Sequence, residues 1–459
     1  MTVHGQPPLT GRREPWMDEL LSDPQAVTGL LETHGSPVNV IEPSALVRNA
    51  AELVDAGREA GVDLRVFYAR KANKAHALVA AARDGGHGVD VASYAELSQV
   101  LDLGMPPERI IVSAAVKNDA LLRLAVGSGV TISVDHVAEL HRIAELSDHG
   151  RPTPVAPRLA PDPAGGVPPT RFGELAQVWL RALAEPVPGV AVTGLHVHLH
   201  GYAVADRARA IAEATNLAGS LGERGHGLSF LDLGGGVPMS YLDDGAEWQD
   251  FWAAMREDAG GESLTWRDHP LTNVYPFHQS PTRGGWLREL LAARPDGGAT
   301  CAELLRGMGL ALHLEPGRSL VDGCGVTLTR VAFVKQRSDG LPLVGVEMNR
   351  TQCRSTSDDF LVDPVLVRTQ PEGEPYDGFL VGAYCIEDEI ILRRRMHFPR
   401  AVAPGDVLAL INTGGYLMHI LESASHQLPL AKNVVWPQRV LDAIDAAPAI
   451  SLAGRHPLD

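Results

Sequence analysis

The chain has 459 residues, of which 45% are hydrophobic and 21% are charged, and its formal net charge at pH 7 is −16. This length predicts two domains, and the composition is typical of a folded enzyme rather than of a disordered chain. An acidic surface repels the phosphate backbone of nucleic acid and anionic lipid, so neither nucleic acid nor a membrane is an expected partner.

Cysteine usage and the N-terminal sequence bear on the compartment. The four cysteines, at positions 301, 324, 353 and 385, form no CxxC pair and no close cluster with histidine that would predict a zinc site. Residues 1–21 lack the apolar run of a signal peptide, and no later run approaches the roughly 20 apolar residues that span a bilayer. We therefore expect a cytoplasmic protein without a metal.

The first part of the chain predicts an α/β barrel. Residues 1–37 follow no clear pattern and are expected to pack against a β domain formed by the end of the chain. Across residues 38–318, short apolar runs alternate with segments of helical spacing, which is typical of βα units around a parallel sheet. The predicted strands are residues 64–68, 88–91, 110–113, 131–134, 155–159, 192–198, 230–233 and 311–315. Eight such units close a (β/α)8 barrel of the TIM type.

Two further regions depart from this rhythm. Residues 241–300 form the longest gap between predicted barrel strands and hold four of the seven tryptophans, so an inserted subdomain is expected there. It is either a lid over the barrel or a peripheral unit with an aromatic core of its own. Residues 319–459 contain short β-rich stretches broken by Gly, Pro and Asp, which predict a C-terminal antiparallel β barrel or sandwich.

Reactive side chains recur at the carboxyl ends of the predicted barrel strands, where TIM barrels carry their chemistry. These residues are Lys71, Asp90, Asp135, Arg158, His198, the glycines Gly234 to Gly236, and Glu315. Glycines after the seventh strand let the backbone approach an anion closely, and Arg318 could add a forked cationic donor to the same phosphate. A phosphate site together with a lysine and a carboxylate describes a pocket for pyridoxal phosphate.

Each member of this set has a specific expected part. Burial would lower the pKa of Lys71, which is useful if its amine serves as a nucleophile or Schiff-base partner. Glu315 is the candidate that keeps the pyridine nitrogen protonated, and His198 is expected to stack on the ring. A rival interpretation comes from the HVHLH run, because alternating His196, His198 and His200 could ligate a metal.

At these residues the sequence resembles the fold-type III pyridoxal-phosphate decarboxylases, the group of diaminopimelate, ornithine and arginine decarboxylases with an alanine-racemase-like barrel. The likeness runs from about residue 38 to 416 and is carried, in order, by FYARKANK, GVDVAS, GLHVHLHG, LDLGGGVP and LEPGRSLV. It implies the internal aldimine at Lys71 and the ring-nitrogen partner at Glu315. It further implies cofactor contacts or supporting polar groups at Asp90, Arg158, His198, Gly201, Gly235, Gly236, Gly317, Arg318 and Tyr416.

The resemblance also covers the C-terminal domain. GAYCIEDE resembles the family's Gly-Pro-x-Cys segment, whose cysteine reaches the active site of the other subunit, so Cys385 implies a head-to-tail homodimer with shared sites. MNRTQCR resembles the Met-Asn stretch that leads to a carboxylate-binding arginine. The resemblance therefore implies that Arg354, Cys385 and Glu387 bind the amino-acid substrate.

Three departures from the family pattern concern the phosphate and the substrate. His200 and Gly201 stand where members have Gly-Ser, whose hydroxyl binds the phosphate. Ile386 follows the cysteine where members acting on diamines or diaminopimelate have an acidic residue, and Arg354 falls one place from the expected spacing. With the aromatic insertion, these changes predict a substrate other than the common basic amino acids.

The sequence thus predicts a pyridoxal-phosphate-dependent decarboxylase that converts an amino acid, or a metabolite derived from one, to an amine and CO2 through an external aldimine and a quinonoid. Protonation by Cys385 or Lys71 would complete the reaction. A racemase or epimerase is the second prediction, disfavoured because alanine racemases carry an arginine in place of Glu315. A catalytically silent relative that binds or regulates a partner is the third.

Overall fold

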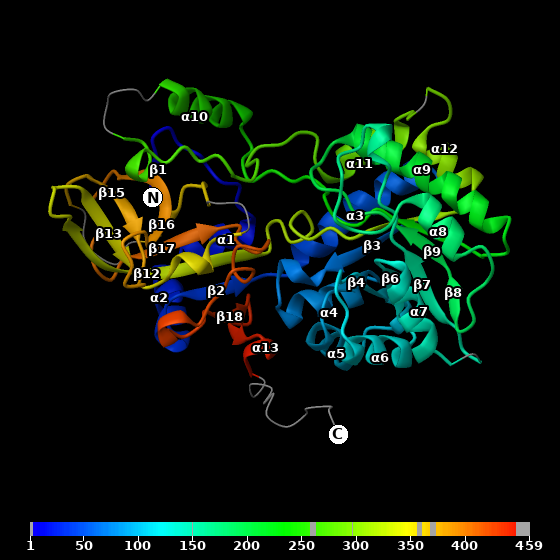
Figure 1. Cartoon of the computed structure of the whole chain (residues 1–459). Helices are drawn as coiled ribbons and strands as arrows, with labels where there is room; N and C mark the ends of the chain where they lie inside the picture. The colour runs from blue at the N-terminus through cyan, green and yellow to red at the C-terminus, as the bar shows by residue number, and fades with distance from the viewer. Residues whose placement is uncertain are drawn as a thin grey trace.

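The structure is a computed structural model that describes residues 3–148, 150–257, 263–295, 297–355, 360–367 and 373–446. A parallel barrel and a mainly antiparallel β domain lie side by side (Figure 1). Within the described ranges, no helix combines the length and the apolar character required to cross a membrane.

The barrel sheet has the strand order β8-β7-β6-β5-β4-β3-β11-β10-β9, and all its neighbours are parallel. A backbone hydrogen bond from Leu159 to His196 and a bridge between Arg158 and His196 bring β7 to β9 and nearly close the ring. The predicted TIM-type barrel is confirmed, with the sixth predicted strand divided into β8 and β9. The strands are β3 (Leu64–Ala69), β4 (Gly88–Val91), β5 (Ile110–Val112), β6 (Thr131–Val134), β7 (Thr153–Pro157), β8 (Val190–Val192), β9 (Gly194–His196), β10 (Phe230–Asp232) and β11 (Ala311–Leu314).

Helices cover the outside of this barrel, and the packed barrel interior buries the inner face of the strands, which is why the strand runs are almost continuously hydrophobic. Several helices begin at a side-chain cap: Ser93 accepts from the backbone N–H of Glu96, and Asn118 accepts from that of Leu121. The helices are α3 (Ser44–Glu59), α4 (His76–Asp84), α5 (Tyr94–Asp102), α6 (Asp119–Ser128), α7 (Val137–Leu146), α8 (Ala176–Ala182), α9 (Val204–Gly222), α11 (Arg283–Ala292) and α12 (Cys301–Gly307).

The β domain takes strands from both ends of the chain. β1 (His4–Gly5) pairs with β16, and β2 (Val38–Ile41) lies between β12 and β18. The sequence boundary at residue 38 therefore differs from the observed sheet, because the four buried residues of β2 find their partners in the β domain. The other strands are β12 (Gly325–Gln336), β13 (Pro342–Val346), β14 (Val365–Val367), β15 (Tyr376–Val381), β16 (Ile390–Phe398), β17 (Val407–Ile411), β18 (Lys432–Val435) and β19 (Val440–Leu441).

Two helices precede β2, and one follows β19. The first two are α1 (Pro15–Leu21) and α2 (Pro24–His34), and most of their buried residues join the apolar core of the β domain. The last helix is α13 (Ala443–Ala446). Just before it, the Asp442 carboxylate accepts hydrogen bonds from the backbone N–H groups of His76 and Ala77 at the start of α4. The C-terminal domain is thereby fixed to the barrel close to Lys71.

The insertion bridges the two domains. Its helix α10 (Gly245–Glu257) lies over the β domain in Figure 1, and the buried Phe251 shares a core with β-domain residues. Phe277 packs at 6.3 Å from Phe360, centroid to centroid, while Arg394 of β16 lies 5.2 Å from the Phe251 ring. Phe251 and Phe277 thus extend the core of the β domain, whereas Trp286 packs in the core of the barrel.

Candidate active site

A cavity of about 340 Å³ opens at the carboxyl ends of the barrel strands, beside the β domain. Nearly every predicted cofactor residue lines it. The lining residues are Lys71, His198, Leu199, His200, Gly201, Tyr202, Gly235, Gly236, Val237, Asn273, Val274, Tyr275, Pro276, Glu315, Gly317, Arg318 and Tyr416. Residues distant in sequence therefore converge on one site, as expected for this end of a TIM barrel.

Lys71 lies in the short 3-10 turn Arg70–Ala72 that directly follows β3. Its Nζ is 2.9 Å from Oδ2 of Asp90, and the other Asp90 oxygen accepts a hydrogen bond from the Ser113 hydroxyl. Burial alone would lower the pKa of Lys71, but the neighbouring Asp90 carboxylate and other negative groups raise it above its ordinary value. The sequence prediction of a lowered pKa is therefore wrong for this arrangement, because the buried Asp90 carboxylate pairs with the ammonium.

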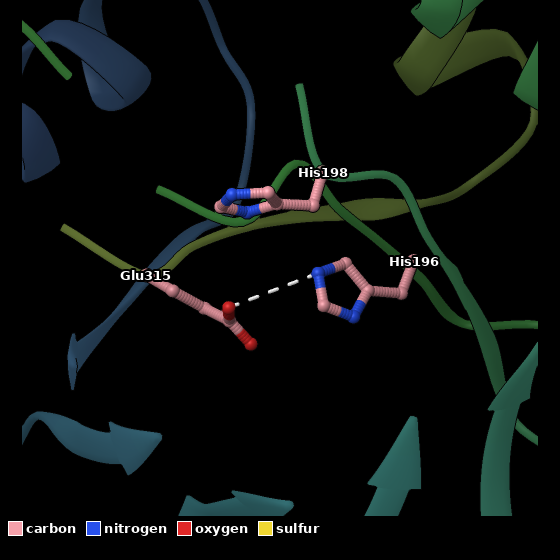
Figure 2. Close-up of side chains that lie close together, drawn as sticks. All are labelled: His196, His198 and Glu315. Carbon is pink, nitrogen blue, oxygen red and sulfur yellow. Dashed lines mark ion pairs between the residues drawn. The ribbon is translucent and has the colours of Figure 1, made fainter. Parts of the chain in front are cut away.

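Glu315 follows β11 and is 1% exposed. Neither of its carboxylate oxygens has a hydrogen-bond partner among the residues that the structure describes. Burial and the nearby carboxylates of Asp232 and Asp90 raise the pKa of Glu315 well above its ordinary value. Figure 2 shows its carboxyl group directed towards His196, whose Nε2 lies 3.7 Å away. A buried polar group left without a partner is costly, so Glu315 is suited to meet a hydrogen-bonding group in the cavity.

His198 forms one side of the same cavity. Phe172 packs edge-on against its imidazole with ring centroids 5.5 Å apart. Burial, together with the charges of Lys71 and Arg158, lowers the pKa of His198 to about 3, so the ring is neutral at physiological pH. A neutral flat ring held in this way can stack on a planar ligand.

Glycines bring the backbone close to the cavity where side chains would not fit. A Cβ atom added at Gly236 would lie 2.0 Å from Nη2 of Arg207, and the φ angle of 75° there also favours glycine. A Cβ at Gly317 would lie 2.4 Å from the hydroxyl oxygen of Tyr416. The two loops can therefore approach a ligand as bare backbone.

Arg318 and Tyr416 lie at the glycine end of the cavity. Arg318 donates a 2.8 Å hydrogen bond to the Tyr241 hydroxyl, and its guanidinium lies 4.1 Å from the centre of the Tyr275 ring. Tyr416 is held beside the lysine turn, because its backbone N–H donates to the Ala72 carbonyl at 2.7 Å. The β domain thus contributes Tyr416 to the barrel site of the same chain.

Arg158 lies behind the cavity rather than in its lining. It forms a 2.9 Å ion pair with Asp135 and donates to the Ser133 hydroxyl at 3.2 Å. Ser133 is in turn 2.6 Å from Nδ1 of His196. This network fixes His196 next to Glu315, and the sequence did not single out Ser133 as part of it.

The three predicted substrate residues do not line this cavity. Cys385 is exposed on the connection between β15 and β16. Glu387 has a 92% exposed side chain and lies 3.9 Å from Arg267, and Arg354 donates to the Ile390 carbonyl at 2.8 Å. Within one chain, the structure separates these residues from Lys71.

The rival metal interpretation is altered by the structure. Ligand atoms of His196, His198 and Glu315 lie within 4.8 Å of one another and could hold a metal ion (Figure 2). His200 is not a member of this group and is exposed. The predicted alternation of three histidines is wrong because β9 ends at His196, so the pleat does not continue to His200.

Some of the cavity wall was missed by sequence reasoning. Tyr202 directly follows Gly201 and could have been found by adjacency, whereas residues 273–276 come from the insertion and carry no motif. Arg207 lies under the glycine loop, where its position on α9 gives no sequence signal.

The chain is similar to several known proteins. The family described as pyridoxal-dependent decarboxylase, pyridoxal binding domain, matches residues 47–258. The uncharacterized protein y4yA of Sinorhizobium fredii is 30% identical over 93% of both chains, and the diaminopimelate decarboxylase of Zymomonas mobilis is 27% identical over 88% of both. The crystal structure of diaminopimelate decarboxylase from M. jannaschii with L-lysine superposes with a TM-score of 0.71 at 20% identity, covering 90% of each chain.

Proposed function

Because the chain belongs to the fold-type III pyridoxal-phosphate-dependent decarboxylases, we propose that it removes the carboxylate of an amino acid, or of a metabolite derived from one, giving an amine and CO2. The observation that carries the proposal is Glu315, a buried carboxyl group at the cavity whose two oxygens have no partner among the described residues. Its hydrogen-bonding capacity fits the nitrogen of the cofactor ring.

The cofactor is pyridoxal phosphate, and the cavity fits it at several points. Lys71 would bind the carbonyl carbon of the cofactor. His198 would stack on the face of the ring, and Glu315 would hydrogen-bond to the ring nitrogen. The glycine loops at Gly235 and Gly317 leave room for a phosphate near Arg318. When bound, this cofactor supplies an electron sink for the electrons released on decarboxylation.

The chain's own groups would then direct the proton transfers. Glu315 would keep the ring nitrogen protonated and so strengthen the electron sink, which favours loss of CO2 over racemisation. Asp90, 2.9 Å from Nζ of Lys71, would keep that amine protonated and ready to deliver a proton. The network from Arg158 through Ser133 would hold His196 beside Glu315.

We extend the proposal to a homodimer with shared active sites. In one chain the cavity contains the cofactor residues but not Arg354, Cys385 or Glu387. Cys385 is exposed, and the adjacent residue Ile386 is 43% exposed, so this segment is free to reach a second copy. A head-to-tail pair would then place Cys385 of one subunit at the Lys71 site of the other, as a second proton donor.

The substrate proposed is an amino acid other than the common basic ones. Ile386 offers no charge to a distal amine at the position after Cys385, and Glu387 stands one residue further on. The insertion adds Tyr275 and its neighbours to the cavity wall. These features alter the side of the site that faces the far end of a substrate.

The test is product analysis with a panel of amino acids. Purified protein loaded with pyridoxal phosphate should release CO2 and form the matching amine from at least one panel member, as measured by mass spectrometry. Lys71→Ala should abolish this reaction and the covalent fixation of the cofactor by borohydride, whereas the exposed Lys335→Ala should retain both. Retention of the carboxylate with loss of chirality would contradict decarboxylation and favour a racemase.

A further inference from the structure

A buried arginine lies behind the loops that form the glycine end of the cavity. Arg207, near the start of α9, is 1% exposed. Its Nη2 donates to the carbonyl oxygen of Gly201 at 2.7 Å and makes longer contacts of 3.3 Å to that of Leu199 and 3.5 Å to that of Gly235. These carbonyls belong to the two loops after β9 and β10, so one guanidinium ties both loops together.

This guanidinium forms no ion pair within the described part of the chain. Its Nε and Nη1 are buried without a hydrogen-bond partner there. The carboxylate of the neighbouring Asp206 pairs with Arg209 at 3.3 Å and acts on Arg207 only from a distance. The Trp286 ring, 5.4 Å from its Cζ, is a weaker partner. Burial lowers the pKa of Arg207 to about 10, which still leaves it charged at neutral pH. A buried cation without a contacting anion is costly, and an anion bound on the far side of the loops would offset that cost.

The position of the guanidinium points to such an anion. A Cβ at Gly236 would lie 2.0 Å from Nη2 of Arg207, so only the glycine backbone separates Arg207 from the cavity that Gly236 lines. Gly201, whose carbonyl Arg207 binds, lines the same cavity. Gly201 also stands where the related decarboxylases have a serine that binds the phosphate, and a Cβ there would meet no atom within 4 Å.

We propose that Arg207 is a positioning residue for the cofactor phosphate. Its guanidinium holds the loops of Gly201 and Gly235 by their carbonyl oxygens. From behind these loops it also supplies a positive charge, which replaces the missing contact of a serine hydroxyl with the phosphate. The ligand class is a phosphate monoester dianion at the glycine end of the cavity. The inference rests on cofactor binding and is independent of which reaction the enzyme performs.

The experiment compares two ligands that differ only in the phosphate. Kd values for pyridoxal phosphate and for pyridoxal are measured on the apoprotein by absorbance titration, and their ratio isolates the phosphate contribution. In Arg207→Gln, which keeps a hydrogen-bond donor but loses the charge, the ratio should fall by about ten-fold or more, because a buried unit charge near the phosphate is removed. In Arg207→Lys, which keeps the charge, it should stay within about three-fold of the wild-type ratio.

Two controls separate this effect from damage to the fold. Arg209→Gln, on the same helix with a 45% exposed side chain, should leave the ratio unchanged. If Arg207→Gln fails to fold, Arg207→Lys decides alone: a ratio near the wild-type value supports the proposal, and a ten-fold loss overturns it. An unchanged ratio in Arg207→Gln, or equal weakening of both ligands, also overturns it.

Discussion

The cofactor end of the cavity and the segment that carries Cys385 are built in contrasting ways. At the cofactor end, Asp90, Arg158 and Glu315 are all less than 3% exposed and are held by strand ends and their networks. By contrast, Cys385 is exposed and Glu387 has a 92% exposed side chain. The cofactor residues are fixed by the fold of one chain, whereas Cys385 and Glu387 lie on an exposed segment of the β domain.

This difference indicates how the site is divided. Two cations of the barrel mouth take their ion-pair partners from the same fold, Lys71 from Asp90 and Arg158 from Asp135. The exposed segment around Cys385 needs no such partners in its own chain, and contacts with a second subunit can fix its conformation. This division predicts that a mutation at the cofactor end in one subunit can be complemented by a mutation near Cys385 in the other subunit. Two mutations at the cofactor end, one in each subunit, cannot complement each other.

The largest expected effect is complementation between two inactive parents. Lys71→Ala and Cys385→Ala should each lose most activity, because one lacks the cofactor lysine and the other the proposed proton donor. If the chains mix at random, half of the dimers are hybrids with one intact site each, so activity should return to about a quarter of the wild-type value. Activity is measured as CO2 release after co-refolding. As the control, a mixture of Lys71→Ala with Glu315→Gln should recover nothing, since both residues belong to one barrel.

The next effect concerns the charge at the ring nitrogen. Glu315→Gln should reduce kcat by about 100-fold, because a neutral amide cannot keep the nitrogen protonated while the cavity shape is preserved. Cofactor affinity should change far less than kcat, since the lysine and phosphate contacts remain. Single-turnover decarboxylation with an active substrate measures the step. An unchanged kcat would show that Glu315 does not tune the cofactor.

A smaller effect is expected at the exposed segment. Glu387→Gln should raise KM by about ten-fold for a substrate with a distal cation and leave kcat nearly unchanged, because only uniform binding is lost. The unfolding free energy should change by less than about 0.5 kcal/mol, since the contact with Arg267 is exposed and 3.9 Å long. The matched control is Glu289→Gln, because Glu289 is also an exposed glutamate but lies on α11, away from the segment that carries Glu387. A loss of kcat instead of a rise in KM would place Glu387 in the chemical step.

The cofactor end could be predicted from the sequence because its residues stand at strand ends. Lys71 and Glu315 each follow a buried barrel strand, and Asp90 lies in the last two residues of β4, so their convergence follows from the closure of the barrel. The order of the sequence motifs along the chain identified the other cofactor residues. This was possible because the carboxyl ends of parallel strands meet at one rim of the barrel, whatever the sequence of the helices between them.

Features that depend on tertiary packing could not be predicted from the sequence. Val38–Ile41 has the pattern of any buried strand, and its pairing with β12, far along the chain, sets its domain. Tyr275 reaches the cavity because the insertion packs on the β domain, which depends on long-range aromatic contacts such as that of Phe277 with Phe360. The partnership of Lys71 with Asp90 also depends on distance, which a motif does not give.

The smallest expected effect is on acid stability, and it too belongs to the cofactor end. Burial lowers the pKa of His198 to about 3 in the folded protein, against about 6.5 in an unfolded chain. Its contribution to stability is therefore fully present above pH 6.5 and is lost as pH falls, because the unfolded state then binds the additional proton. In His198→Asn apoprotein, urea unfolding between pH 6 and pH 5 should show a slope that is shallower by about 1.4 kcal/mol per pH unit at most. His141→Asn, whose side chain is exposed on α7 in the folded state, should keep the wild-type slope. An equal change of slope in both variants would mean that the burial of His198 at the cavity does not determine how stability depends on pH. The buried cofactor end would then not differ electrostatically from the exposed segment around Cys385.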